Sequence, residues 1–188
     1  MKPDAGFTLI ELIITVTVAA VLLGLAVPSF QTMMQNNRLV SQANEFITTL
    51  NLARSEAVKR GTRVTVCASS GGTACDGGGT GIWTTGWIVF TDPNNVGVYD
   101  AASETILQVH GALFTGYTLT AGATLTNFVS YLGTGLSQGA GGATPDGTAT
   151  STFALADPRG TDTSGNSLQR TMAMNATGQI TTNHASFF

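Results

Sequence analysis

The chain has 188 residues, of which only 10% are charged and 23 are glycine, and its formal net charge is −3. An acidic balance excludes a general electrostatic attraction to nucleic acid or to anionic lipid. Low charge with abundant glycine and threonine is typical of a β-rich extracytoplasmic domain rather than of a cytosolic enzyme. The length allows one soluble domain of about 130–150 residues in addition to an N-terminal anchor.

A long apolar run begins close to the N-terminus, and over residues 12–27 its only polar side chains are those of threonine. As a helix that rises about 1.5 Å per residue, residues 7–30 are long enough to cross a bilayer core of about 30 Å. A carboxylate, Glu11, lies just inside this run, and a short polar leader that ends at Gly6 precedes it.

A secretory signal peptide is cut after its apolar segment, so that segment is lost from the mature protein. No convincing small-x-small cleavage site follows the run, and 24–26 is the nearest candidate. A cut before the run would keep the apolar helix as an anchor. A charge in the middle of a membrane helix costs about 2.5–3.5 kcal/mol, so Glu11 needs a partner or a position near the interface.

The run Gly6-Phe7-Thr8-Leu9-Ile10-Glu11 closely resembles the prepilin cleavage motif of type IV pilins and type II secretion pseudopilins. The resemblance implies that a prepilin peptidase cuts between Gly6 and Phe7 and that the new amine of Phe7 is methylated. It also implies that Glu11 pairs with this amine on a neighbouring subunit, and that Pro28 matches a proline that kinks or loosens the helix. A plain anchor with an isolated glutamate is the less favoured alternative.

From residue 31 to Arg60 the apolar residues keep a helical period. They form one stripe, which consists of Leu39, Ala43, Phe46, Leu50, Ala53 and Ala57. The polar residues that fall off this stripe are Arg38, Gln42, Glu45, Asn51 and Lys59. Gly61 is a suitable C-terminal stop. We therefore expect one helix from the membrane to Arg60, with its second half packed on a sheet; a coiled coil is the alternative, although the stripe is short and rich in alanine.

Beyond Gly61 the hydrophobic period changes to two, which predicts strands. Residues 63–67 alternate like a strand with one buried face, and 87–90 form an apolar strand. Further short strands are expected at 105–109, 117–120, 128–132, 152–156, 171–174 and 179–182. Residues 137–150 lack periodicity and predict a mobile loop, whereas Met172 and Met174 alternate on one strand face and are expected in the core.

Cys67 and Cys75 are the only cysteines, and Cys75 lies in a glycine-rich loop over residues 69–81. In an oxidising periplasm such a close pair usually forms a disulfide. The spacing does not fit a zinc site with four ligands, and no histidine lies nearby in the sequence.

Several further runs resemble the GspH/FimT family of minor pilins and pseudopilins. They are Leu52–Arg60, Val64–Cys67, Gly86–Phe90, Gln108–Gly111 and, less closely, Phe153–Gly160 and Thr177–Gln179. In the first run, Arg54 and Glu56 are expected to have a structural role against the sheet. Many relatives have cysteine where Ala156 stands, and many FimT-like members end in a Gly-Arg-x-Arg motif linked to DNA binding. Here that motif reads Gly178-Gln179-Ile180-Thr181, so both arginines are missing.

DNA is a partner that the sequence does not favour. In the sheet domain beyond its first strand, the only basic residues are Arg159 and Arg170, too few for a convincing basic patch. These two residues are the candidate weak DNA contacts. Stacking of single-stranded bases on Trp83, Trp87 and Tyr117 requires these rings to be exposed.

The loop from Asp92 to Glu104 faintly resembles a calcium loop. Val96 stands where an EF-hand needs an oxygen ligand, so a surface turn is the default interpretation. His110 and His184 have no serine, cysteine or aspartate at motif spacing, which argues against nucleophilic catalysis. We therefore predict no catalytic residue, no metal and no cofactor.

These features predict an α+β, type IV pilin-like chain, in which a long N-terminal transmembrane α-helix packs on a C-terminal antiparallel β-sheet domain. We expect four segments: a removed leader over 1–6, a transmembrane half of the helix over 7–30, an amphipathic half over 31–60 and a β-rich globular domain over 61–188.

The resemblance implies a minor type IV pilin, a structural and assembly subunit in the priming or tip complex of a bacterial pilus. The expected partners are other pilins or pseudopilins, bound through the N-terminal helix, together with prepilin peptidase and the inner membrane. Lys2 weakly favours a cytoplasmic leader and a periplasmic C-terminal domain. A minor pseudopilin of type II secretion and a DNA-binding minor pilin for natural transformation are the alternatives.

Overall fold

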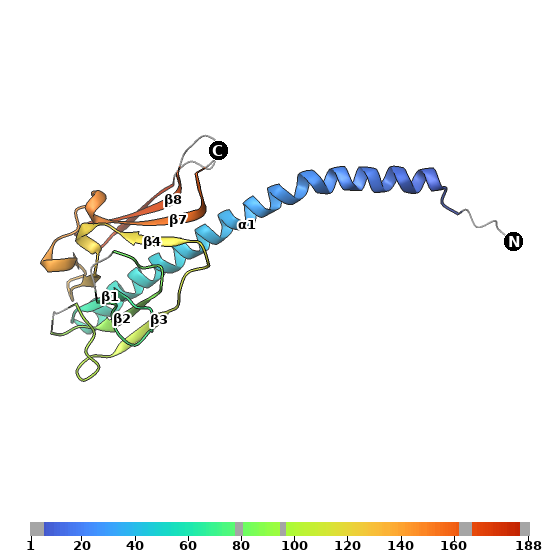
Figure 1. Ribbon diagram of the computed structural model, residues 1–188. Helices are drawn as coiled ribbons and strands as arrows, with labels where there is room; N and C mark the ends of the chain where they lie inside the picture. Colours follow the sequence, from blue (N-terminus) through green and yellow to red (C-terminus); the bar gives the residue numbers. More distant parts are fainter. Residues whose placement is uncertain (1–5, 78–80, 95–96, 162–166, 185–188) are drawn as a thin grey trace. The chain divides into compact units, whose positions relative to one another are not determined.

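The computed structural model describes residues 6–77, 81–94, 97–161 and 167–184. These residues form one long helix followed by strands and short 3-10 helices (Figure 1). The elements are α1 (Leu9–Arg60), β1 (Val64–Ala68), β2 (Trp87–Thr91), β3 (Ile106–His110), β4 (Thr118–Ala121), η1 (Ala123–Leu125), β5 (Phe128–Tyr131), β6 (Ser137–Gln138), η2 (Ala140–Gly142), η3 (Ala149–Ser151), β7 (Thr152–Thr161), β8 (Ser167–Met174) and β9 (Ile180–His184). The chain divides into two compact units, residues 1–38 and 39–188.

Helix α1 is continuous from Leu9 to Arg60, which confirms the prediction of a single helix. It ends before Gly61, whose φ of 64° lies in the left-handed region that favours glycine. Pro28 lies inside the helix and lacks the N–H that an interior residue donates. The hydroxyl of Thr32 donates to the Pro28 carbonyl oxygen at 3.1 Å. A kink at Pro28 stays a prediction.

All six residues of the predicted apolar stripe are buried, as expected for the face of α1 that packs on the sheet domain. Gln42, which falls off the stripe in the sequence pattern, is also buried and is only 2% exposed. Its Oε1 accepts a hydrogen bond from the backbone N–H of Phe114 at 3.0 Å. Gln42 therefore satisfies a loop amide that packs on the helix, a contact that periodicity alone does not reveal.

The two charged residues with an expected role against the sheet behave differently. The Nε of Arg54 donates to the carbonyl oxygen of Gly135 at 3.1 Å, which ties the helix to the turn after β5. Glu56 instead pairs with Lys59 and Arg60 of its own helix, at 3.3 and 2.6 Å. Arg54 therefore has the expected role against the sheet, whereas the ion pairs of Glu56 lie within its own helix.

Strands β3, β2, β1, β5 and β6 form one antiparallel sheet in that order. All five residues of β1, in the middle of this sheet, are buried, so the prediction of one exposed face is wrong. Val64 and Val66 belong to the main core with α1. Cys67 belongs to a second cluster on the other face, which Cys75 and Tyr99 help to cover. The intervening loops therefore bury the face that alternation assigns to solvent.

Strands β4, β7, β8 and β9 form a second antiparallel sheet, and β7 and β8 lie side by side in Figure 1. Met172 and Met174 of β8 are fully buried, which confirms their predicted place in the core. Strand β7 extends beyond its predicted end and contains Pro158. The register with β8 is irregular between Ala156 and Thr161, and an irregular stretch is where a strand tolerates proline.

Residues 137–150, predicted to be a mobile loop, instead contain β6, η2 and the start of η3. The N–H of Ser137 donates to the carbonyl oxygen of Ala176 at 3.0 Å, and its hydroxyl donates to that of Asn175 at 2.7 Å. These contacts join positions far apart in the sequence, so a local pattern could not predict them.

A cluster of aromatic rings joins the helix to both sheets. Phe46 of α1 packs edge-to-face against Trp83, Trp87 and Phe153, with ring centroids 4.7–5.8 Å apart. All four side chains are buried. Trp87 comes from the first sheet and Phe153 from the second, so Phe46 is the point at which helix and sheets share one core.

The predicted disulfide is present. The Cys67 and Cys75 sulfur atoms are bonded, with the Cα atoms 5.6 Å apart. Gly72, with a φ of 70°, lies between them, and a Cβ there would come within 2.7 Å of Val109. The bond and the glycine together let this loop lie close against the first sheet.

Replacing both cysteines with alanine should loosen the loop around Gly72 without unfolding the domain. A disulfide that closes a loop of 15 residues contributes about 3 kcal/mol, and this shorter loop should contribute somewhat less. Limited proteolysis should show new cleavage within residues 69–77. Chemical denaturation should show a lower free energy of unfolding than that of the wild type. Labelling of both thiols in native protein from the periplasm would contradict the bond.

Candidate assembly surfaces

The prepilin-like motif lies where α1 begins. Gly6, Phe7 and Thr8 precede the helix, and the Phe7 side chain is 83% exposed. The Thr8 hydroxyl accepts a hydrogen bond from the N–H of Glu11 at 3.3 Å, and Glu11 Oε2 accepts from the N–H and the hydroxyl of Thr8 at 3.5 Å. This reciprocal pairing is a capping box. The sequence reasoning missed it, although the Thr-x-x-Glu spacing is its signature.

The first part of α1 exposes its apolar side chains on every side. Residues 6–34 are all exposed, and α1 is long and apolar enough to cross a membrane. Such a surface requires lipid or neighbouring helices to cover it. Residues 1–5, which make up the rest of the predicted leader, lie outside the described residues.

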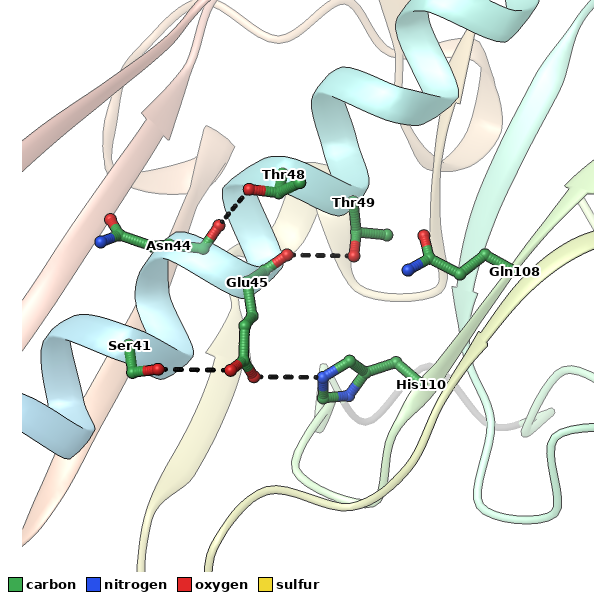
Figure 2. A pocket seen from close by; sticks show the side chains of 7 residues that line it. All are labelled: Ser41, Asn44, Glu45, Thr48, Thr49, Gln108 and His110. Atoms are coloured by element: carbon green, nitrogen blue, oxygen red, sulfur yellow. Dashed lines mark hydrogen bonds and ion pairs between the residues drawn. The ribbon is translucent and has the colours of Figure 1, made fainter.

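A groove runs between α1 and β3, within the second unit (Figure 2). Its larger part has a volume of about 550 Å³, and an adjoining part of about 130 Å³ shares Glu45 and His110 with it. The lining residues, which define the α1–β3 groove, are Ser41, Gln42, Asn44, Glu45, Thr48 and Thr49 from α1, Gln108 and His110 from β3, and Ala112, Leu113 and Phe114 from the following loop.

Glu45 and His110 meet in the middle of the α1–β3 groove. Glu45 Oε2 lies 3.4 Å from His110 Nε2, and Glu45 Oε1 accepts from the Ser41 hydroxyl at 3.2 Å (Figure 2). The His110 ring stacks on Trp87 with centroids 3.9 Å apart. The Trp87 indole N–H in turn donates to the Thr49 hydroxyl at 3.2 Å. The imidazole is thus fixed in place by a core tryptophan.

Two glutamines in the groove carry buried polar atoms. Within the part of the chain that the structure describes, neither the Nε2 of Gln42 nor the Oε1 of Gln108 has a hydrogen-bond partner. Gln108 and His110 both reach toward α1 in Figure 2. The pairing of β2 with β3 shifts by one residue between Val89 and Phe90, and such a bulge re-aims the side chains that follow it.

The GspH family, described as type II transport protein GspH, matches residues 42–178, and the prokaryotic N-terminal methylation motif matches residues 1–27. The chain belongs to the GspH family. This membership confirms the family inferred from the sequence runs. Family and fold are those of structural pilin subunits with a membrane-anchoring N-terminal helix, which assemble with other pilins.

Crystal structures of the type IV minor pilin FimU of Pseudomonas aeruginosa strain PAO1 are similar to this GspH-family chain. One has 18% identity and a TM-score of 0.52, and covers 80% of this chain and 92% of FimU. A second crystal form has 19% identity and a TM-score of 0.49, with 77% and 92% covered. No curated protein matches the chain significantly. The similarity confirms the predicted fold, a long apolar helix packed on antiparallel sheets.

The two candidate DNA contacts of this GspH-family chain are engaged within the fold. Arg159 donates to both carboxylate oxygens of Asp157, through Nε at 2.8 Å and through a terminal nitrogen at 2.6 Å. Burial alone would raise the pKa of Asp157, but hydrogen bonds from Arg159 bring that pKa below its usual value. Arg170 is half-buried on β8, and burial lowers the pKa of its guanidinium.

The aromatic rings considered for stacking on single-stranded DNA are not available. Trp83 and Trp87 are fully buried and Tyr117 is 3% exposed, so these rings lack the exposure that stacking on bases requires. Apolar packing around the helix takes all three into the core.

We expect the full chain, in detergent micelles, to bind DNA weakly or not at all. Phosphate contacts come from Lys and Arg, and Arg159 is already paired with Asp157. The test is a titration with single- and double-stranded DNA at several salt concentrations. Micromolar or tighter binding near physiological salt, weakened by Arg159→Ala or Arg170→Ala, would overturn this expectation.

The Asp92–Glu104 loop uses its carboxylates for internal hydrogen bonds. Asp92 Oδ2 accepts from the Thr65 hydroxyl at 2.8 Å and from the N–H of Gly97 at 3.1 Å. Glu104 accepts from the N–H of Asp100 at 2.8 Å, and burial raises the pKa of Glu104. No group of three or more metal-binding side chains occurs among the described residues, and Val96 lies outside them.

The side chain of His184 also lies outside the described part of the chain.

Proposed function

We propose that the chain is a minor type IV pilin, a structural and assembly subunit in the priming or tip complex of a bacterial pilus. One observation carries the proposal: a prepilin-like motif opens directly into a helix of 52 residues, whose first part is apolar and exposed and whose second part enters a sheet domain. A soluble enzyme does not need an exposed apolar helical segment, whereas a filament packs such segments together at its centre.

The proposed steps of processing and assembly follow from the motif. Prepilin peptidase removes residues 1–6 on the cytoplasmic side of the inner membrane, and Phe7 becomes a methylated N-terminus. The chain then stays in the inner membrane as a single-pass protein, with its C-terminal domain in the periplasm. Glu11 pairs with the N-terminal amine of a neighbour when the helix leaves the lipid for the filament. The accessible, non-helical Gly6–Thr8 segment supports cleavage at this point.

A minor pseudopilin of type II secretion is the second candidate function, since the matching family is described as a type II transport protein. DNA uptake is not favoured, because the terminal arginine motif is absent and Arg159 is paired with Asp157.

Deletion of the gene in a strain that has both a type IV pilus and a type II secretion system distinguishes the pilin function from the pseudopilin function. The pilin proposal predicts loss of surface pili, normal release of secreted enzymes and restoration of pili by the wild-type chain. Normal piliation together with accumulation of secreted enzymes in the periplasm would instead establish the pseudopilin function.

A further inference from the structure

Two acidic side chains face each other where β2 ends and β3 begins. The N–H of Thr91 donates to the carbonyl oxygen of Thr105 at 3.0 Å, and the N–H of Thr105 donates to the Thr91 hydroxyl at 3.0 Å. These contacts extend the antiparallel pairing of β2 with β3 by one position. The next residues along, Asp92 and Glu104, are then directly opposite, a position that puts Cβ atoms about 4.5–5.5 Å apart.

Both members of this carboxyl pair are buried. Asp92 is fully buried, and Glu104 is 7% exposed. Burial penalises each negative charge, and two carboxylates that share one site also repel each other. The pair is therefore much more stable with one proton than with none.

The surroundings of Asp92 favour its charged form. Its Oδ2 accepts from the Thr65 hydroxyl at 2.8 Å and from the N–H of Gly97 at 3.1 Å. The positive charge of Arg63, just before β1, attracts it as well. Donors and a nearby cation stabilise a carboxylate, so the proton belongs on the other member of the pair.

The surroundings of Glu104 favour its neutral form. Its Oε2 accepts from the N–H of Asp100 at 2.8 Å, but its Oε1 is buried and has no hydrogen-bond partner among the described residues. An ionised carboxylate only accepts, whereas a protonated carboxyl group also donates. A proton on Oε1 turns this atom into a donor to the opposite carboxylate. Burial, together with the charges of Asp92 and Asp100, raises the pKa of Glu104.

Glu104 also holds the cover of the second hydrophobic cluster, which contains Cys67 and Phe90. Its carbonyl oxygen accepts from the Tyr99 hydroxyl at 3.5 Å, and the Tyr99 ring packs edge-to-face on Phe90 with centroids 5.4 Å apart. Gly97, whose N–H binds Asp92, lies so close to the Phe128 ring that a Cβ would collide with it. The carboxyl pair thus fastens both ends of the stretch from residue 97 to residue 104.

We propose that Asp92 and Glu104 share one proton, carried by Glu104, and that this proton keeps residues 97–104 closed over the second cluster. When the pH rises and the proton leaves, two buried negative charges face each other and the stretch loosens. The fold thus contains a pH-sensitive switch that is closed in acid. This inference does not depend on the proposed function.

Arg63, Tyr99 and Asp100 complete the charged and titratable surroundings of the pair within the described residues. Arginine stays charged at all pH values used below. Hydrogen bonds from the Ala102 N–H and the Ser103 hydroxyl hold the pKa of Asp100 below its usual value, so Asp100 stays ionised. The change of charge at this site therefore comes from Glu104.

The first test compares the stability of Glu104→Gln with that of the wild type, as full chains in detergent micelles. Glutamine has the shape of a protonated glutamate and stays neutral, so the variant resembles the closed form at every pH. A carboxyl group whose pKa is raised by folding stabilises the protein at low pH, and this contribution is lost as the pH rises through the raised value. The unfolding equilibrium constant of the wild type, relative to that of Glu104→Gln, should rise at least about threefold between about pH 5 and pH 8.

Glu56→Gln is the matched control for this comparison. Hydrogen bonds from Arg60 and Lys59 lower the pKa of Glu56, so this carboxylate is ionised throughout the same range. The control variant should therefore keep the pH dependence of the wild type.

A second measurement detects the proton directly and does not require Glu104→Gln to fold. Labelling of glutamate side-chain carboxyl groups with carbon-13 gives NMR signals from Glu11, Glu45, Glu56 and Glu104. Glutamine variants assign the first three signals, and Glu104 follows by elimination. We expect Glu104 to keep the chemical shift of a protonated acid at a pH at which Glu56 is already ionised.

Three outcomes would overturn the inference. The first is a Glu104 signal that is fully ionised at about pH 5, where an unperturbed glutamate is already mostly ionised. The second is a Glu104→Gln variant with the same pH dependence of stability as the wild type. The third is stabilisation of the wild type, but not of Glu104→Gln, by millimolar calcium at about pH 8, which would assign the pair to a cation instead of a proton.

Discussion

Removing the charge of Glu11 should abolish assembly while leaving membrane insertion and cleavage intact. An apolar helix inserts more readily without a charge, so any loss of assembly must come from a lost partner. Removing one member of a buried ion pair typically costs about 3–5 kcal/mol. A Glu11→Ala chain should therefore be recovered from sheared filaments in amounts at least about tenfold lower than the wild type.

The capping box allows a sharper version of this experiment. Glutamine can replace glutamate at the third helical position of a capping box, so Glu11→Gln keeps the contacts with Thr8 but removes the charge. We expect Glu11→Gln to fail as severely as Glu11→Ala. Thr17→Ala is the control, since the Thr17 hydroxyl donates within its own helix, to the Ile13 carbonyl oxygen. Normal recovery of Glu11→Gln would assign Glu11 to helix capping alone and would contradict the ion pair.

Truncation of Phe46 should cause the largest loss of stability in the globular domain. Its ring is 1% exposed and contacts Trp83, Trp87 and Phe153, so alanine would leave a cavity at the point where α1 meets both sheets. Phe→Ala substitutions in cores cost about 3–5 kcal/mol. The chain should then lose a large part of the total stability of about 5–15 kcal/mol that is typical of a domain.

Denaturation of the full chain in detergent, followed by tryptophan fluorescence, measures this loss. Both tryptophans of the chain contact the Phe46 ring, so the signal arises from the same cluster. Val58→Ala is the matched control on α1, because Val58 is 53% exposed and surface changes stay within about 0.5 kcal/mol. A cost below about 1 kcal/mol for Phe46→Ala would mean that the aromatic cluster does not hold helix and sheets together.

Local patterns predicted the elements of this fold well. The helical period identified all six buried stripe residues of α1, because that pattern reflects one face turned to a core. Short apolar or alternating segments located the strands of both sheets except β6, which lies in the predicted loop. Helix capping by Thr8 and Glu11 was not predicted, although the Thr-x-x-Glu spacing is the signature of a capping box.

Contacts between distant residues were beyond such reasoning. Gln42 is buried because a loop 72 residues away donates its amide to it, and β1 is buried on both faces because a disulfide-bound loop covers the second one. The α1–β3 groove has the same origin, since Glu45 and His110 are 65 residues apart and meet only in the folded chain. The sequence indicated a filament subunit, but the groove could be located only in the tertiary structure.

The intact mass of the protein recovered from sheared filaments tests the central claim most directly. A processed filament subunit must lack residues 1–6 and carry one methyl group on the amine of Phe7. We therefore expect a mass that corresponds to residues 7–188 with one methyl group and one disulfide. A chain that still begins at Met1, or one that begins beyond Val27, would contradict the assignment as a pilin subunit, as would its absence from the filament fraction.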